Sequence, residues 1–201
     1  MSAGPPEDPN SRGDWTARYA RDRREESRPS RWIMDQSAMF AARSLVCDVA
    51  GGTGRHAVAL AAKGHRIVLV DFVAAAVTVA TRRSPNVHGV VADVRSLPLK
   101  EGMFDGVVVT NFLDRDLIPA LLALLKPAGH LLYETYTTEH AALVAAGLAR
   151  APRSARFLLK PGELRALVAP HPILDYREGD IEDEAGRRAC ASVHAIRGAG
   201  R

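Results

Sequence analysis

The chain has 201 residues and a net charge of +4, which fits a single domain with its own core and predicts no strongly basic surface for nucleic acid. Its two cysteines are too few for a disulfide framework, and no apolar run approaches the roughly 18 residues that a membrane helix needs. We therefore expect a soluble, cytoplasmic protein without a nucleic-acid or membrane partner, and composition leaves the oligomeric state open.

The first part of the chain differs from the rest. Residues 1–13 carry three prolines and almost no apolar side chain, which predicts a disordered tail. In residues 14–43, arginines alternate with acids, which favours a solvated helix face over a nucleic-acid patch. Trp15, Arg18 and Tyr19 form an aromatic and cationic cluster there. We predict a helical lid with Tyr19 nearest the ligand; the alternative is that the aromatic residues merely anchor a surface helix.

From residue 44 to residue 201, strand-like and helix-like segments alternate. The expected strands are Ser44–Val49, Arg66–Val70, Val87–Ala92, Phe104–Thr110, Gly129–Tyr136, Ile173–Glu178 and Arg188–Arg197. The expected helices are Arg55–Lys63, Ala74–Arg83, Asp116–Leu125 and one that begins at Pro161. The last two strands alternate polar and apolar residues and flank the polar loop Gly179–Gly186, which predicts an antiparallel hairpin. The whole pattern predicts an α/β sandwich with a mostly parallel sheet.

The most informative stretch begins at the end of the first expected strand and reads Asp48-Val-Ala50-Gly51-Gly52-Thr-Gly54. Glycines let the backbone turn sharply and let a ligand lie against it. The N–H groups that begin the next helix favour negative charge or polar oxygens. Asp48 beside the loop then calls for a ligand with a cationic or hydroxylated part. The alternative is that its carboxylate only caps the turn or the helix.

Polar residues also end the next strands. In open α/β sheets, ligands bind outside the carboxyl ends of the strands, where these residues meet. We expect Asp71 to accept both hydroxyls of a ribose, with Phe72 against adenine. Asp93 would accept from the adenine amino group with Val94 packing on the ring, and Asn111 would face the reacting end. Taken singly, Asp71 also suits a helix N-cap and Asp93 an exposed acid at a strand end.

The glycine loop, Asp71, Ala92-Asp93-Val94 and Phe104-Asp105-x-Val107-Val108 together resemble the class I S-adenosylmethionine-dependent methyltransferases. The resemblance covers nearly the whole chain beyond the N-terminal tail and departs at Ala50, where the family usually has glycine. It implies a three-layer Rossmann-like fold of seven strands, with S-adenosylmethionine as cofactor and no metal. It also implies that Asp48 and the loop glycines lie near the methionine part of the cofactor.

Two C-terminal stretches, Phe157–Leu164 and Tyr176–Gly179, are similar to a narrower branch, the tellurite-resistance-type methyltransferases. The loop after Gly179 has no His-Arg pair of the kind that this branch places near its substrate. The branch therefore implies a small-molecule acceptor, but tellurite or selenite itself is not expected.

Methyl transfer from a sulfonium is an in-line displacement, so the enzyme mainly aligns nucleophile, methyl and sulfur. A thiolate or chalcogenide needs no general base, whereas a hydroxyl or an amine benefits from one. Glu134 and Tyr136, at the end of the fifth strand, are the candidate catalytic residues, with Glu134 the first choice. The alternative is a polar strand end with ordinary hydrogen bonds. With no appended domain and no basic stripe, we expect a small-molecule acceptor: a thiol, a chalcogen or another small compound.

Two other functions remain open. Gly52-x-Gly54-x-x-Ala57 with Asp71 also fits a dinucleotide fingerprint, so an NAD(P)-dependent Rossmann oxidoreductase is one alternative. Three features count against an oxidoreductase: Asp48 at the loop, Asp93 after the third strand, and the lack of a Tyr-x-x-x-Lys pair after the fifth strand. The other alternative is a protein that binds S-adenosylmethionine without catalysis.

Overall fold

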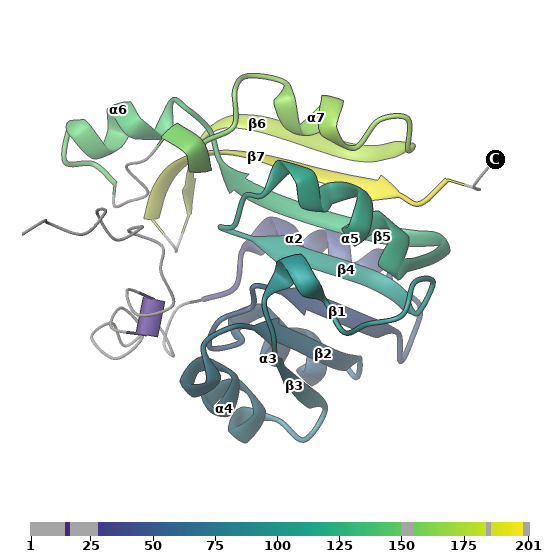
Figure 1. Cartoon of the computed structure of the whole chain (residues 1–201). Coiled ribbons are helices and arrows are strands. Elements are labelled where there is room, and N and C mark those ends of the chain that lie inside the picture. The colour runs from purple at the N-terminus through teal and green to yellow at the C-terminus, as the bar shows by residue number, and fades with distance from the viewer. Residues whose placement is uncertain (1–14, 17–27, 150–154, 184–185, 199–201) are drawn as a thin grey trace, which may run out of the picture.

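The computed structural model describes residues 15–16, 28–149, 155–183 and 186–198, and its strands form one sheet with helices on both faces (Figure 1). The strands are β1 Leu45–Val49, β2 Arg66–Asp71, β3 Val87–Val91, β4 Phe104–Thr110, β5 Leu125–Tyr136, β6 Ile173–Asp183 and β7 Gly186–Ile196. Their order is β3-β2-β1-β4-β5-β7-β6. Strands β1 to β5 are mutually parallel, and β7 runs antiparallel to both β5 and β6. This confirms the predicted seven-stranded sheet with its antiparallel C-terminal hairpin.

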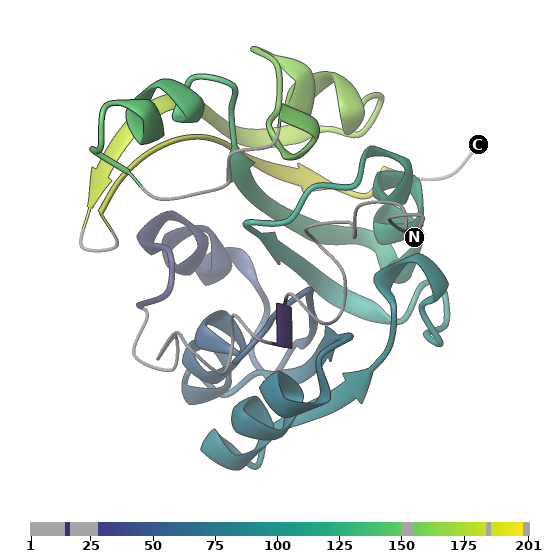
Figure 2. The same ribbon diagram turned by 60° about the vertical axis from the view of Figure 1, so that its left-hand side comes forward.

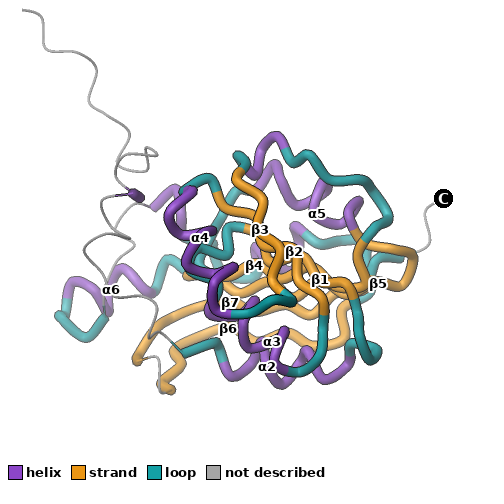
Figure 3. Tube along the Cα trace, turned by 90° about the horizontal axis from the view of Figure 1, so that it is seen from below, coloured by secondary structure: helices purple, strands orange, loops and turns teal. Residues whose placement is uncertain are grey.

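Helices cover the two faces of the sheet. The α-helices are α2 Arg31–Gln36, α3 Arg55–Ala62, α4 Ala74–Arg83, α5 Ile118–Leu124, α6 His140–Ala145 and α7 Glu163–Leu167. The short 3-10 helices are η2 Ser37–Met39, η3 Val94–Ser96, η4 Arg115–Leu117 and η5 Ala155–Phe157. Seen from below, α2 and α3 lie on one side of the sheet and α5 on the other (Figure 3). The result is the predicted three-layer sandwich.

Alternate residues of the central strands feed two apolar cores. On β1, Val46 is buried in the core that α2 and α3 cover, together with Ile33 and Leu60. Its neighbour Cys47 faces the opposite core, where Ile118 of α5 packs. Because both faces are covered, the central strands are apolar at nearly every position, as parallel strands usually are.

Two boundaries differ from the prediction. Strand β5 begins at Leu125, not at Gly129, and the expected helix before it is divided into η4 and α5. Between β4 and β5 the register shifts, and Pro127, which cannot donate a ladder hydrogen bond, falls in that irregular stretch. The expected loop Gly179–Gly186 is also wrong, because β6 and β7 stay paired through it to the pair Asp183 and Gly186.

The polar composition of that outer hairpin explains the error. Figure 2 shows the two strands extending together beyond the rest of the sheet. Both faces of such a ribbon can meet water, so its strands need no apolar alternation. A cross-strand ion pair joins Arg187 to Asp180 at 2.6 Å, and such pairs stabilise a ribbon modestly.

Only part of the predicted N-terminal lid can be placed. Residues 1–13, Arg18 and Tyr19 lie outside the described residues, so the tail and the lid contact of Tyr19 stay predictions. Within residues 28–43, the hydroxyl of Ser30 caps α2 and accepts from the Ile33 N–H. Trp32 is 6% exposed and belongs to the core above α3, so this end of the segment is part of the fold. Among the described helices, none is long and apolar enough to cross a membrane.

Candidate cofactor site

The glycine loop is shaped around the Asp48 carboxyl group. Ala50, Gly52 and Gly54 have φ values of 53°, 57° and 79°, a region that glycine enters freely and alanine enters at a cost. A Cβ added to Gly51 would lie 2.9 Å from the carboxyl carbon of Asp48, closer than real Cβ contacts allow. Ala50, where the resemblance leads one to expect glycine, therefore holds a left-handed backbone at some cost, whereas Gly51 leaves no space for a side chain.

Asp48 is fully buried, with 0% of its surface exposed. Its Oδ2 accepts a hydrogen bond from the Ala57 N–H at 3.1 Å, so one oxygen does cap α3, as the alternative interpretation expected. Its Oδ1 has no hydrogen-bond partner within the described part of the chain. Burial raises the pKa of Asp48 to about 7, although the Ala57 N–H and the Arg55 charge oppose that shift. A buried acceptor without a donor is costly, which makes this oxygen a natural ligand contact.

Asp71 connects the loop to the end of β2. Its Oδ2 accepts from the Gly52 N–H at 2.9 Å and its Oδ1 from the Val73 N–H at 2.9 Å. Burial raises its pKa, and these backbone hydrogen bonds lower it. The Phe72 N–H is a third backbone donor to this carboxylate, and because each of its oxygens has two lone pairs, Asp71 can order the loop and still accept a further donor. Its proposed contact with ribose hydroxyls is compatible with this geometry and stays a prediction.

The other predicted cofactor residues lie along the same edge. Asp93 is exposed, and its carboxylate accepts from the Arg95 N–H at 2.9 Å where η3 begins. Val94 is 8% exposed and packs into the core, and Phe72 is half-buried. Asn111 is exposed with a φ of 56°, and its N–H donates to the Glu134 carbonyl oxygen at 2.9 Å. Their contacts with a ligand stay predictions.

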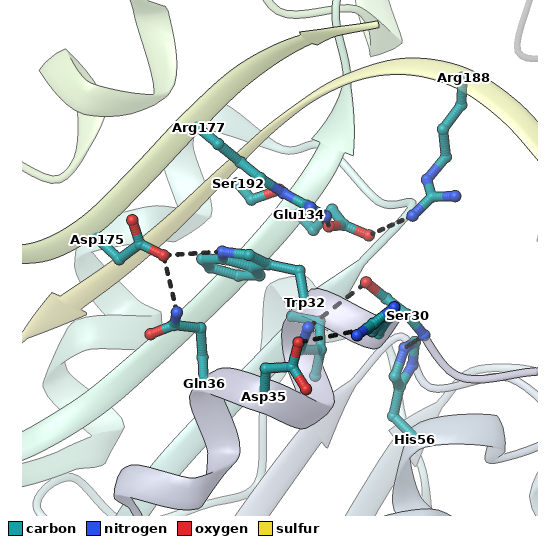
Figure 4. A network of polar contacts seen from close by, with 12 residues as sticks. Ser30, Trp32, Asp35, Gln36, His56, Glu134, Asp175, Arg177, Arg188 and Ser192 are labelled. Atoms are coloured by element: carbon teal, nitrogen blue, oxygen red, sulfur yellow. Dashed lines mark hydrogen bonds and ion pairs between the residues drawn. The ribbon is translucent and has the colours of Figure 1, made fainter. Parts of the chain in front are cut away.

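Glu134 is buried and surrounded by donors from the hairpin (Figure 4). Its Oε2 accepts from the Arg177 guanidinium at 2.8 Å and from the Ser192 hydroxyl at 2.9 Å. Its Oε1 lies 3.5 Å from the Arg188 guanidinium. This carboxylate therefore orders two arginines at the end of β5. Tyr136, the second candidate, is half-buried and lies against the His140 ring, with 4.3 Å between the ring centroids.

A second polar chain fixes α2 to the hairpin (Figure 4). The Asp175 carboxylate accepts from the Trp32 indole N–H at 3.0 Å and from the Gln36 amide at 2.7 Å. Since a carboxylate can only accept, the Gln36 amide oxygen faces Nδ1 of His194, at 2.7 Å. That nitrogen then donates, and the other ring nitrogen accepts from His130 at 2.8 Å. In this network the His194 ring therefore has a fixed tautomer, with its proton on Nδ1.

Sequence reasoning gave no site role to two residues at the start of α3, although it expected His56 to be a helix residue beside the loop. His56 accepts from the Ser30 N–H at 2.9 Å and lies 3.2 Å from the Thr110 hydroxyl, so it joins the N-terminal segment to the end of β4. Burial holds its pKa well below its ordinary value, which keeps the ring neutral. Arg55 precedes it and is half-buried beside the loop. Their position directly after Gly54 was the available signal.

Comparison with known proteins gives three kinds of match. A family model described as a methyltransferase domain matches residues 46–129. A demethylmenaquinone methyltransferase from Clavibacter sepedonicus is 34% identical over 110 residues, which are 51% of this chain and 45% of that protein. The chain thus spans under half the length of this curated relative.

Solved structures of similar fold include an S-adenosylmethionine-dependent methyltransferase from Methanosarcina mazei, with a TM-score of 0.68 and 20% identity over 86% of this chain and all of that one. TehB from Haemophilus influenzae has a TM-score of 0.64 and 19% identity over 82% of this chain and 60% of that one. At these identities, the likeness concerns the fold. It confirms the expected Rossmann-like fold of the class I methyltransferases, and the match to the methyltransferase-domain model is limited to residues 46–129.

Proposed function

We propose that this chain, which carries a class I methyltransferase domain, binds S-adenosylmethionine at the glycine loop and methylates a small-molecule acceptor. The cofactor would lie across the carboxyl ends of β1, β2 and β3, and the acceptor would approach from the ends of β4 and β5. When bound, S-adenosylmethionine supplies an electrophilic methyl group on a sulfonium.

The observation that carries this proposal is the buried Asp48 carboxyl with an unpartnered Oδ1. The methionine part of the cofactor ends in an ammonium group, which can fill that acceptor position. An ammonium opposite Asp48 would also favour its ionised form, which burial alone disfavours. A pyrophosphate at the same loop would instead bring negative charge beside this carboxyl group and would disfavour its ionised form still further.

The remaining assignments follow the strand ends. We assign the ribose hydroxyls to Asp71, whose oxygens keep free lone pairs, and the adenine end to Asp93 with Phe72 and Val94. Asn111, on the loop after β4, would lie beside the reacting methyl group. These residues position the cofactor, and their contribution to rate is alignment and the exclusion of water.

On the acceptor side, Tyr136 remains our proposed contact at the end of β5. Glu134 would act through Arg177 and Arg188, which it holds in place at the same edge. The matched family model ends at residue 129, before most of β5 and the hairpin, so the acceptor of the relatives is not inherited with it. We therefore propose the acceptor class only as a small molecule, which agrees with the named activity of the curated relative.

Calorimetric titration with S-adenosylhomocysteine and, in parallel, with NADH tests the proposal. We expect S-adenosylhomocysteine to bind with micromolar affinity and NADH to give no heat. Binding of NADH alone would overturn the proposal in favour of an oxidoreductase. Binding of neither ligand to the folded protein would overturn it as well.

A turnover assay then distinguishes an enzyme from a protein that only binds the cofactor. Labelled S-adenosylmethionine is offered with a panel of thiols, chalcogen compounds and quinols, and the formation of S-adenosylhomocysteine is followed. Methylation of one acceptor supports the enzyme. Tight cofactor binding without turnover across the panel would favour a protein that only holds the cofactor.

A further inference from the structure

Four polar residues form one row across the C-terminal half of the sheet. In the strand register, Thr110 of β4 pairs with Glu134 of β5. Glu134 pairs in turn with Ser192 of β7, and Ser192 pairs with Arg177 of β6. Side chains that lie opposite each other in a sheet share a face. The Arg177 guanidinium lies 5.5 Å from the centre of the Trp32 ring on α2, so the row is on the face that α2 covers.

Positive charge exceeds negative charge around Glu134 in the part of the chain that the structure describes. Arg177 and Arg188 both contact its carboxylate, at 2.8 and 3.5 Å (Figure 4). Arg188 is 8% exposed and lies four residues before Ser192 on β7, and therefore on the same face. Arg55, at the start of α3, adds a third guanidinium whose electrostatic neighbours include Glu134 and Arg188. One carboxylate thus faces three cations.

The other acids nearby do not balance this charge. The Asp175 carboxylate accepts from two side chains of α2 and makes no ion pair with an arginine among the described residues. Burial raises the pKa of Asp48 to about 7, which disfavours its ionised form. Burial also lowers the pKa of His56, and the charges of Arg55 and Arg188 lower it further. The end of β5 is therefore a site that favours an added negative charge.

Arg177 keeps a donor for a ligand. Its Nε donates to the Ser192 hydroxyl at 3.2 Å, and its Nη2 donates to the Glu134 carboxylate at 2.8 Å. Its Nη1 makes no hydrogen bond with any described residue, and 33% of the side chain is exposed. A guanidinium has five N–H donors in a planar fork, which matches a carboxylate or another oxyanion. Because Glu134 and the Trp32 ring hold this fork in place, its donors are ordered before a ligand binds.

We propose that the methyl acceptor carries a carboxylate or a similar oxyanion, which Arg177 and Arg188 bind; this inference rests on the proposed function. Both guanidiniums reach the two oxygens of Glu134, so they lie close enough together to share a second anion. The anchoring group takes no part in the bond changes. A lone pair of the acceptor's nucleophile forms the bond to the methyl carbon, while the electron pair of the breaking carbon–sulfur bond stays on sulfur. The charge thus selects and aligns the acceptor.

Matched thiols that differ in the charge of one group test the proposal. 3-Mercaptopropionate and 4-mercaptobenzoate are each compared with the amide of the same acid. Methylation by S-adenosylmethionine is followed, and each thiol is titrated calorimetrically into the complex with S-adenosylhomocysteine. We expect the wild type to prefer the carboxylate of at least one pair by roughly 10-fold in kcat/KM, the scale of a charge-assisted hydrogen bond.

The variants remove the two guanidiniums in turn. Arg177→Gln and Arg188→Gln should each abolish most of this preference, mainly through a higher KM for the carboxylate, and leave the amide within about threefold. Arg177→Lys should retain part of the preference, because it keeps the charge but not the fork. Arg187→Gln is the matched control and should behave as the wild type. Arg187 precedes Arg188 on β7, and its exposed side chain pairs with Asp180.

The wild-type comparison needs no variant. If the wild type binds S-adenosylhomocysteine but shows no preference for the carboxylate of any pair, in turnover or in binding, the proposal is overturned. An unchanged preference in both glutamine variants, with only a lower melting temperature, would overturn it as well and make the arginines structural. A wild type that does not bind S-adenosylhomocysteine would instead refute the proposed function, which keeps the two failures distinguishable.

Discussion

At the residue scale, the buried Asp48 carboxyl links the stability of the fold to the chemistry of the site. Its Oδ2 accepts from the Ala57 N–H at the start of α3, and its Oδ1 has no hydrogen-bond partner among the described residues. Burial raises its pKa from 3.8 to about 7, so in the folded protein it keeps its proton where an unfolded chain would have lost it.

This raised pKa predicts that stability falls as pH rises from about 4 to about 7. In that window, the folded state binds more protons than the unfolded state, so each step upward in pH favours unfolding, by on the order of 4 kcal/mol in total from Asp48. Above pH 7, both states are ionised and the contribution is flat. Urea unfolding of wild type and Asp48→Asn between pH 4.5 and about pH 8 measures it.

We expect Asp48→Asn to lose this slope and to exceed the wild type in stability at the alkaline end. Asp93→Asn, at an exposed strand end, is the control and should follow the wild type. Parallel curves for wild type and Asp48→Asn would contradict the raised pKa of Asp48.

Sequence reasoning reached the residues whose signal is local. Asp48 and Asp71 were identifiable because each acid ends an apolar run, and the glycines mark the turn between them. Arg55 directly follows Gly54 in the motif, but its surroundings depend on three-dimensional packing that the sequence does not show. Glu134 was identified, but its partners Arg177 and Arg188 come from strands 43 and 54 residues away.

At the scale of the elements, two glycines at helix ends separate backbone strain from crowding. Gly54 precedes α3 with a φ of 79°, and an added Cβ would lie 2.7 Å from the Cβ of Ala80. Gly64 follows α3 with a φ of 91°, and an added Cβ would meet nothing within 4 Å. Both positions disfavour a side chain on backbone grounds, but only Gly54 is also crowded.

We therefore expect Gly64→Ala to cost about 1–2 kcal/mol, the strain of a left-handed backbone alone. Gly54→Ala should cost roughly 1–3 kcal/mol more, because overpacking is added to strain. Denaturant unfolding of the two variants gives both values. Equal losses would mean that α4 moves away from the loop without cost and that the close contact with Ala80 is unimportant.

Some of these helices and strands could be predicted from the sequence, and others could not. The central strands were predictable because apolar side chains are needed on both faces, and α4 has the predicted bounds Ala74–Arg83. The outer hairpin was predicted too short, since backbone pairing there is supported by cross-strand charges such as Arg187 and Asp180 and not by an apolar pattern. The short helix α2 gave no periodicity of its own, and its position depends on contacts with β6 and β7.

At the scale of the whole molecule, α2 joins the N-terminal segment to the far half of the sheet. Gln36 bridges His194 and Asp175 at 2.7 Å each, and Ser30 donates to His56 beside the glycine loop. The segment that precedes the sheet is therefore held at two points, one next to the proposed cofactor and one on the hairpin.

Gln36→Ala should destabilise the protein by about 1–3 kcal/mol, because the His194 N–H and one acceptor of Asp175 lose their partner in a partly buried position. Hydrogen exchange should speed up across α2 before it changes in the central strands. Asp35→Ala, at an exposed position one residue away, is the control. Unaltered exchange in α2 would mean that its apolar contacts, with Trp32 and Ile33 buried, suffice to hold it.

The strand order separates the molecule into two contiguous stretches of chain. Residues 45–110 build β1 to β4 with the glycine loop, and residues 125–196 build β5, β6 and β7. Under the proposed function, mutation or recombination in the second stretch would change the acceptor while the proposed cofactor site in the first stretch stays intact. A laboratory search for variants with new acceptors is best confined to β5, the hairpin and α6, with the residues of the first stretch left unchanged.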